Sequence, residues 1–175
     1  TNFGRLKPSD NAAALRFMNT IEAEGCPLIS LVDTPGAMAG SAANRDMQSS
    51  TISWMISKCG ELSVPHISLT IGMGGSGGAA TLTGFFNDII EKAWHNVIHP
   101  EGAARIARNT TLAEILAEAN LSPVDLVKAF IKDKILSISG IRKDGIEAQV
   151  DAKKLKLWAW KRLQQSKELI DKKIE

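Results

Sequence analysis

Five glycines within the seven residues 72–78 constrain the fold of this chain more than any other sequence feature. An apolar segment from Pro65 to Ile71 leads directly into this cluster, as a buried strand would. Small and apolar residues follow over 79–85 and favour a helix. Glycine has no Cβ atom, so such a cluster lets the chain turn tightly and approach a ligand closely. The order predicts a strand, a tight turn and a helix.

The cluster matches the dinucleotide fingerprint as Gly72-x-Gly74-x-x-Gly77. That fingerprint also needs a second strand that ends in an acidic residue, which would bind the ribose. No such strand is predicted, because Asp88 lies in a Phe-Phe-Asn-Asp segment close after a predicted helix. The sequence therefore gives little support for binding of a nicotinamide or flavin dinucleotide.

The same residues match a nucleophile elbow as Gly74-x-Ser76-x-Gly78, in which a serine hydroxyl is exposed on a strained turn. A hydrolase of this kind also needs a histidine base and an acidic residue that orients it. Three histidines are candidates for that base: His66, His95 and His99. A serine peptidase that uses Ser76 is one alternative.

A third interpretation needs only backbone geometry, since N–H groups in a glycine turn are well placed to hold an oxyanion. The alternative without a ligand is a plain connection between a strand and a helix. That alternative is weakened because five glycines cost backbone entropy that a simple connector has no need to incur.

The remaining pattern predicts alternating helices and strands, and hence an α/β fold with a parallel sheet. Up to the glycine cluster, the expected elements are a helix at 10–24, a strand at 27–32 buried on both faces, a helix at 47–59 and a strand at 65–71. The later ones are a strand at 97–98, two short helices that begin near Thr111 and Ser122, and a long helix at 152–174. Ligand sites of parallel sheets lie at the carboxyl ends of the strands. Both loops of interest, 33–40 and 72–78, follow such ends.

The first of these loops begins with Asp33-Thr34-Pro35-Gly36, which resembles the DxxG element of GTPases. No GxxxxGK[ST] segment precedes it, so the loop that would bind the phosphates is missing. A simple Pro-Gly turn, with Asp33 accepting local hydrogen bonds, is the alternative without a ligand.

Composition narrows the class of protein. The chain has 175 residues and a formal net charge of +2, which fits one globular domain of ordinary composition. Cys26 and Cys59 lack metal-ligand or disulfide-framework spacing, and we expect two buried thiols. No apolar stretch is long enough to span a membrane, the first residues do not form a signal peptide, and no nucleic-acid motif accompanies the basic residues near the end. We expect a cytoplasmic protein without a metal.

Four motifs, taken in order and spacing, resemble the carboxyltransferase alpha subunit family of bacterial acetyl-CoA carboxylases. They are Pro27-Leu-Ile-Ser-Leu-Val-Asp-Thr-Pro-Gly-Ala37, Val64-Pro65, Ile71-Gly-Met-Gly-Gly-Ser-Gly-Gly-Ala79 and Val97-Ile-His-Pro-Glu-Gly-Ala103. The resemblance covers roughly residues 3–140. The chain departs from the family pattern after Ala37, where Met38-Ala39-Gly40 stands in place of an aromatic residue and a second Pro-Gly.

The resemblance implies a crotonase- and Clp-like ββα superhelix of the α/β class, incomplete at its amino-terminal side. The carboxyltransferase domain would cover residues 1–150, and a helical extension would cover 151–175. By the same resemblance, peptide N–H groups of Gly77, Gly78 and Ala79 would stabilise charge on the biotin ureido oxygen. The residues that would line the biotin side of the site are Pro35, Gly36, Ala37, Gly74, Gly75 and Ser76.

The function that the resemblance implies is carboxyl transfer between carboxybiotin on a carrier protein and an acyl-CoA, with acetyl-CoA and malonyl-CoA as the expected pair. The implied partners are a beta-type carboxyltransferase subunit and a biotin carboxyl carrier protein, in a hetero-oligomer in which the chain also pairs with a second copy. A biotin-dependent acyl-CoA decarboxylase, a Clp-like peptidase and a noncatalytic scaffold subunit are the alternatives.

Overall fold

The structure is a computed structural model and describes residues 4–90, 93–96, 111, 113–114, 117 and 149–174. The chain divides into two compact units, Thr1–His95 with Asp144–Glu175, and Asn96–Lys143. The expected strand at 97–98 and the expected helix near Ser122 lie outside the described residues. In the second unit, the helix expected near Thr111 begins with the reciprocal hydrogen bonds of a capping box, since the Thr111 N–H donates to Glu114 and the Glu114 N–H donates to Thr111.

Up to the glycine cluster, the first unit contains the predicted helices and strands in order, and one short helix, α2, that was not predicted. Its elements there are α1 (Pro8–Ala23), β1 (Leu28–Thr34), α2 (Ser41–Arg45), α3 (Gln48–Glu61), β2 (His66–Gly75) and α4 (Ser76–Ala80). The strand predicted at 65–71 therefore continues into the glycine cluster, and the turn itself is confined to Gly75 and Ser76. The helix predicted at 79–85 is wrong in its extent, because α4 ends at Ala80.

Beyond α4, the part of the chain that the structure describes contains three further strands and the helix that runs to Ile174. These are β3 (Phe86–Ile90), β4 (Trp94–Asn96), β5 (Gln149–Val150), a 3₁₀ turn η3 (Ala152–Lys154) and α9 (Leu155–Ile174). The strand order is β1-β2-β3-β5, with β4 paired to β2. The β1–β2, β2–β3 and β3–β5 pairs are all parallel, which confirms the predicted sheet type.

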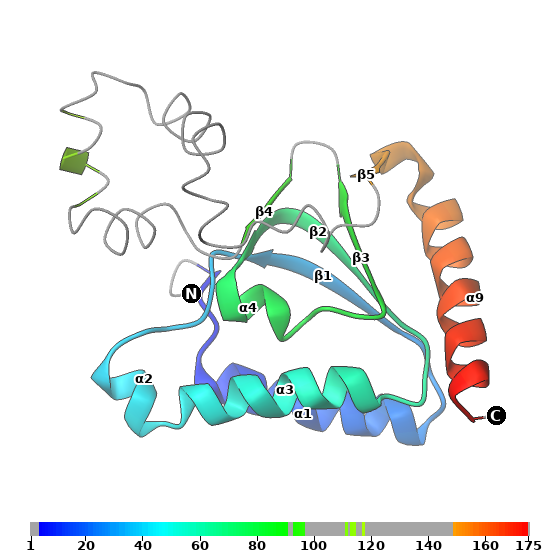
Figure 1. The fold of residues 1–175 in the computed structure, drawn as a ribbon, viewed down its shortest axis with the longest axis horizontal. Helices are drawn as coiled ribbons and strands as arrows, with labels where there is room; N and C mark the ends of the chain where they lie inside the picture. Colours follow the sequence, from blue (N-terminus) through cyan, green and yellow to red (C-terminus); the bar gives the residue numbers. More distant parts are fainter. Residues whose placement is uncertain are drawn as a thin grey trace. The chain divides into compact units, whose positions relative to one another are not determined.

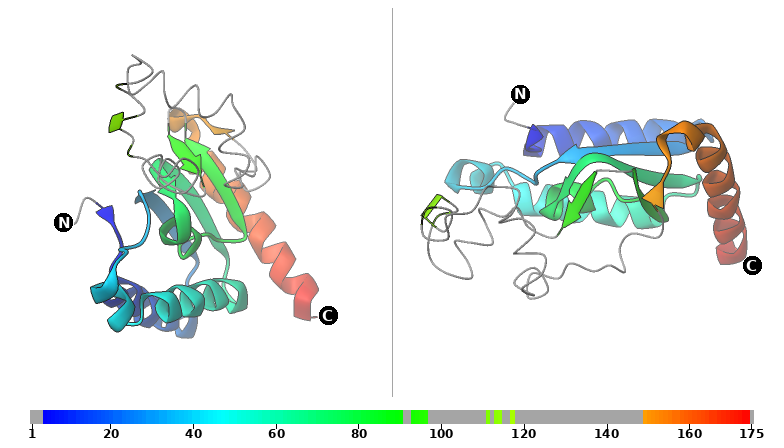
Figure 2. Two further views of the ribbon diagram at one scale, coloured as in Figure 1. Left: turned by 60° about the vertical axis from the view of Figure 1, so that its left-hand side comes forward. Right: turned by 90° about the horizontal axis from the view of Figure 1, so that it is seen from above.

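The core lies between the sheet and the helix pair α1 and α3, which run side by side in Figure 1. Met18 of α1 and Met55 of α3 are fully buried there with Leu28 of β1. Asn11 of α1 donates a buried hydrogen bond to Thr51 of α3 at 3.2 Å, which fixes the two helices in register. Figure 2 shows α2 and α9 at opposite ends of the strands, with α2 beyond their carboxyl ends.

The opposite face of the sheet is covered unevenly. Ile29 of β1 and Phe86 of β3 lie in one row with Ile67 of β2, which is fully buried. Helix α9 reaches this face at β3, where the Arg162 guanidinium lies 4.5 Å from the centre of the Phe86 ring. Ile29 and Leu31 are 41% and 59% exposed. The prediction that β1 is buried on both faces is therefore wrong, because its side chains alternate between the core and this open face.

The two cysteines differ in burial. Cys59 is in the core, as predicted, and burial raises the pKa of its thiol to about 11. Cys26 is exposed in the turn between α1 and β1, so the prediction that it is buried is wrong. Its turn follows Gly25, whose positive φ of 68° ends α1 and carries the chain out to the surface.

Candidate functional site

The two loops singled out in the sequence meet at the carboxyl ends of β1 and β2. Thr34 pairs with Gly74, so the residues that follow each strand start from neighbouring positions. A Cβ atom on Gly75 would lie 2.4 Å from the Pro35 carbonyl oxygen, and one on Gly78 would lie 2.5 Å from the Gly36 carbonyl carbon. Main chain therefore packs directly on main chain, and no side chain fits at either position.

The loop after β1 is held by the hydroxyl of Thr34, a buried residue that the sequence analysis did not single out. Its Oγ1 accepts a hydrogen bond from the Gly36 N–H at 3.1 Å and lies 2.7 Å from the carbonyl oxygen of Gly4. The Leu6 N–H donates to the Gly36 carbonyl at 3.2 Å from the other side. The N–H of Gly36 is thus occupied, whereas the N–H of Ala37 has no acceptor among the described residues.

The N–H of Ala37 lies beside the first turn of α4. Its nitrogen would be 2.8 Å from a Cβ atom on Gly78. The N–H groups of Gly77 and Gly78 belong to the first turn of the helix, where no carbonyl of the same helix can accept them. Ala79 is the fourth residue of α4, so the helical pattern pairs its N–H with the carbonyl of the N-cap residue Gly75. Neither Gly77 nor Gly78 donates to another described residue. The structure therefore brings N–H groups from both loops, left without acceptors, into one small region.

Ser76 starts α4 with a left-handed backbone, at a φ of 55°. This conformation is strained for a residue other than glycine, and the serine side chain is exposed. A sharp turn with an exposed serine is the backbone part of a nucleophile elbow. The catalytic part is missing among the described residues, because the Ser76 hydroxyl makes no hydrogen bond there, and His99 lies outside them.

Both described histidines are engaged elsewhere. His66 is buried, and its Nε2 lies 2.9 Å from the Ser30 hydroxyl, while burial lowers its pKa to about 4. The ring of His95 packs against Gly74, with Nδ1 3.2 Å from the Thr70 hydroxyl, and burial lowers its pKa as well. Neither ring contacts the Ser76 hydroxyl through a hydrogen bond, so the described residues contain no Ser-His pair.

Asp88 lies within a strand, contrary to the sequence analysis, which placed it after a helix. It belongs to β3, and its carboxylate is fully buried. Oδ2 accepts hydrogen bonds from Trp158 Nε1 at 2.6 Å and from Arg162 Nε at 2.7 Å, and Oδ1 accepts one from the Arg162 guanidinium at 2.9 Å. This carboxylate is saturated by α9 and is not available to a ribose, so the dinucleotide interpretation fails.

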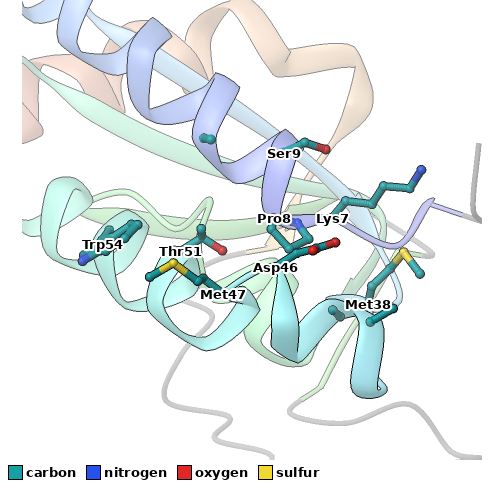
Figure 3. Close-up of a pocket in the computed structure, with 11 residues that line it drawn as sticks. Lys7, Pro8, Ser9, Met38, Asp46, Met47, Thr51 and Trp54 are labelled. Carbon is teal, nitrogen blue, oxygen red and sulfur yellow. The ribbon is translucent and has the colours of Figure 1, made fainter.

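A cavity of about 500 Å³ lies between the first turn of α1, α2 and α3 (Figure 3). It is lined by Lys7, Pro8, Ser9, Ala12, Met38, Ala42, Ala43, Asp46, Met47, Thr51 and Trp54. Met38 directly follows Ala37, yet none of the predicted site residues lines this cavity. The unused N–H groups and the cavity are therefore separate features.

Two further features are absent from the part of the chain that the structure describes. No three histidine, cysteine, aspartate or glutamate side chains in these parts of the chain gather closely enough to bind a metal ion. None of the described helices combines the length and apolar character that crossing a membrane requires.

The family described as acetyl co-enzyme A carboxylase carboxyltransferase-like matches residues 1–175. The chain is 34% identical to the acetyl-coenzyme A carboxylase carboxyl transferase subunit alpha of Staphylococcus epidermidis, over 99% of this chain and 56% of that protein. It is 38% identical to the subunit alpha of Paracoccus denitrificans, over 84% of this chain and 48% of that protein. The chain thus spans about half the length of these relatives.

Two solved structures share the fold. The beta subunit of geranyl-CoA carboxylase from P. aeruginosa superposes with a TM-score of 0.68 at 20% identity, over 93% of this chain and 33% of that one. Transcarboxylase 12S, with methylmalonyl-coenzyme A bound, gives a TM-score of 0.68 at 17% identity, over 93% of this chain and 31% of that one. The predicted crotonase-like α/β fold is confirmed by these likenesses and by the parallel sheet.

Proposed function

The chain belongs to the acetyl co-enzyme A carboxylase carboxyltransferase-like family, and from this premise we propose that it is part of an enzyme that transfers a carboxyl group between biotin and an acyl-CoA. The observation that carries the proposal is the direct contact of the two loops, which gathers the N–H groups of Ala37, Gly77 and Gly78, each without an acceptor among the described residues. The proposed substrates are acetyl-CoA and malonyl-CoA, in line with the names of the relatives.

The proposed role of these N–H groups is to stabilise negative charge. When a carboxyl group leaves the biotin nitrogen, negative charge collects on the ureido oxygen. Fixed hydrogen-bond donors there lower the free energy of the transition state. A single donor in a comparable oxyanion site contributes about 3 kcal/mol. The donors that we propose are Gly77 and Gly78, with Ala37 as a third. The N–H of Ala79 is left out because the helical pattern of α4 pairs it with the Gly75 carbonyl. The N–H of Gly36 is left out because it is bound to Thr34.

The backbone needs no help from a side chain in this scheme. The acyl-CoA carbon that accepts the carboxyl group must first lose a proton, and the biotin anion is itself a base that accepts it. The residues Pro35, Gly36, Gly74, Gly75 and Ser76 then act by shape, since they bring the two loops together without filling the space before the donors. The direct contacts of Gly75 and Gly78 with the other loop support this division of roles.

We propose further that the chain works in a cytoplasmic hetero-oligomer. Its partners would be a beta-type carboxyltransferase subunit, which holds most of the acyl-CoA, and a biotin carboxyl carrier protein, which delivers carboxybiotin. A pair of these chains would lie within the assembly. The support for a multi-subunit assembly is that the relatives are named as subunits.

The test is purification of the tagged chain from its source organism, followed by mass spectrometry and a transfer assay. The expected result is co-purification of a biotinylated protein and a beta-type carboxyltransferase chain, with biotin-dependent conversion of malonyl-CoA to acetyl-CoA by the complex. Absence of transfer in a complex that contains all three chains would favour the scaffold alternative. Covalent labelling of Ser76 by a fluorophosphonate would instead point to a peptidase.

A further inference from the structure

Asp33 lies where the pairing of β1 and β2 becomes irregular. Val32 pairs with Thr70, but Thr34 pairs with Gly74. Strand β1 thus advances by two residues while β2 advances by four. The extra length of β2 must bulge out of the regular ladder, and some of its N–H groups lose their partners there.

The Asp33 side chain lies directly on this bulge. Its Oδ1 accepts a hydrogen bond from the Met73 N–H at 2.9 Å. Gly72 leaves room for the carboxylate, because a Cβ atom on Gly72 would lie 2.3 Å from Oδ1 and 2.6 Å from Cγ. One carboxylate therefore both satisfies the unpaired N–H and fills the space beside the glycine.

We propose that Asp33 is a positioning residue for carboxyl transfer, an inference that rests on the proposed function. Met73 directly precedes Gly74, and Asp33 is two residues before Pro35, so their hydrogen bond ties the two loops together just before they meet. It sets how far the end of β2 extends, and hence where the N–H groups of α4 stand relative to Ala37.

The side chain acts through the backbone and not on the substrate. Its described contacts are with Gly72 and Met73, and none of the proposed donors touches it. An unpaired negative charge on Asp33 would oppose the negative charge that the site is proposed to stabilise. The Asp33 carboxylate is not unpaired, because it accepts the Met73 N–H. A displacement of about 1 Å at a reacting centre can lower the rate about 100-fold, so a small shift of this bulge has a large effect.

The experiment uses the purified complex of this chain with its partner subunit, with free biotin as carboxyl acceptor and malonyl-CoA as donor. Asp33→Ala removes the acceptor, and Gly72→Ala displaces the carboxylate with a methyl group. Each is expected to lower kcat by about 10- to 100-fold, while KM for biotin changes by less than about threefold. The double variant should be no slower than the slower single variant, because both changes break the same hydrogen bond.

Asp33→Asn is the decisive conservative variant. Its amide oxygen can still accept the Met73 N–H, so it should restore most of kcat with an unchanged pH profile. Glu61→Ala, which removes an exposed carboxylate at the end of α3, is the control and should match the wild type. Thermal unfolding and gel filtration give the folded, assembled fraction of each variant, to which kcat is referred.

Four results would overturn the inference. If the Asp33→Ala complex has the wild-type kcat, Asp33 has no positioning role. If the unfolded fraction of Asp33→Ala accounts for its whole decrease in kcat, the role of Asp33 is only structural. An Asp33→Asn variant as slow as Asp33→Ala, with one limb of the pH profile lost, would make the carboxylate an acid or base. A wild-type complex without transfer activity would contradict the proposed function itself, and so is distinguished from the other three.

Discussion

The end of β2 and the middle of β3 are stabilised in opposite ways. Where β2 ends and α4 begins, the main chains of Gly75 and Gly78 pack against Pro35 and Gly36 without a side chain between them. In β3, a single buried carboxylate, that of Asp88, receives three hydrogen bonds from the side chains of α9. Added side-chain atoms would disrupt the first region, whereas removal of side-chain atoms would disrupt the second. The proposed catalytic site and the buried ion pair thus lie in separate parts of the fold.

The strongest challenge to this comparison is to add atoms at the backbone contact. Gly78→Val should lower carboxyl transfer by about 1,000-fold, because the side chain would separate the two loops and displace at least one donor. Steady-state transfer from malonyl-CoA to biotin, measured with the purified complex, checks this. A variant with half the wild-type rate or more would contradict the backbone-donor account.

Removing atoms at the second region should act on stability. Asp88→Ala leaves the largely buried Arg162 guanidinium without its carboxylate, and breaking a buried ion pair in this way costs about 3–5 kcal/mol. Urea denaturation should show this decrease in the free energy of unfolding. Asp171→Ala, on the exposed side of α9, is the matched control and should change it by less than about 0.5 kcal/mol. Equal effects of the two variants would show that the Asp88 cluster does not anchor α9.

His66, the first residue of β2, makes the stability of the fold depend on pH. Burial lowers the pKa of His66 from an ordinary 6.5 to about 4, so the folded protein favours the neutral ring. Its contribution to stability is complete above pH 6.5 and is lost as the pH falls from 6.5 towards 4. The full loss corresponds to about 3 kcal/mol, of which about 2 kcal/mol falls between pH 7 and pH 5.

Chemical denaturation at a series of pH values measures this loss. His66→Gln removes the titrating ring and should make the unfolding free energy less dependent on pH over that interval. An unchanged dependence in His66→Gln would assign it to other groups.

The smallest effect is expected at Ser76. Since its hydroxyl makes no hydrogen bond among the described residues, Ser76→Ala should change the rate of carboxyl transfer by less than about twofold. Ser76→Gly should raise the free energy of unfolding by about 1 kcal/mol, because glycine adopts the φ of 55° without strain. If Ser76→Ala loses activity while its fold stays intact, the Ser76 hydroxyl takes part in the reaction.

The sequence allowed the meeting of the two loops to be predicted, because parallel strands end at the same edge of a sheet and both loops follow such ends. The occupied N–H of Gly36 could not be predicted, since it depends on the rotamer of Thr34. Strand β3 was missed because Phe86–Ile90 contains Asn87 and Asp88, which are unfavourable in strands. Their burial depends on partners such as Arg162, 74 residues further along the chain. For the same reason, the sequence did not allow us to predict that α9 covers one face of the sheet only in part and leaves Ile29 exposed.

The distance between β2 and α9 has a consequence for biosynthesis. The Ser166 hydroxyl that accepts the His66 N–H is translated 100 residues after that strand. At a translation rate of about 5–20 residues per second, β2 is synthesised roughly 5–20 seconds before the part of α9 that it contacts. During that time Ile67 and Leu69 have no cover from α9, and the chain on the ribosome presents an apolar sheet surface to which a chaperone can bind.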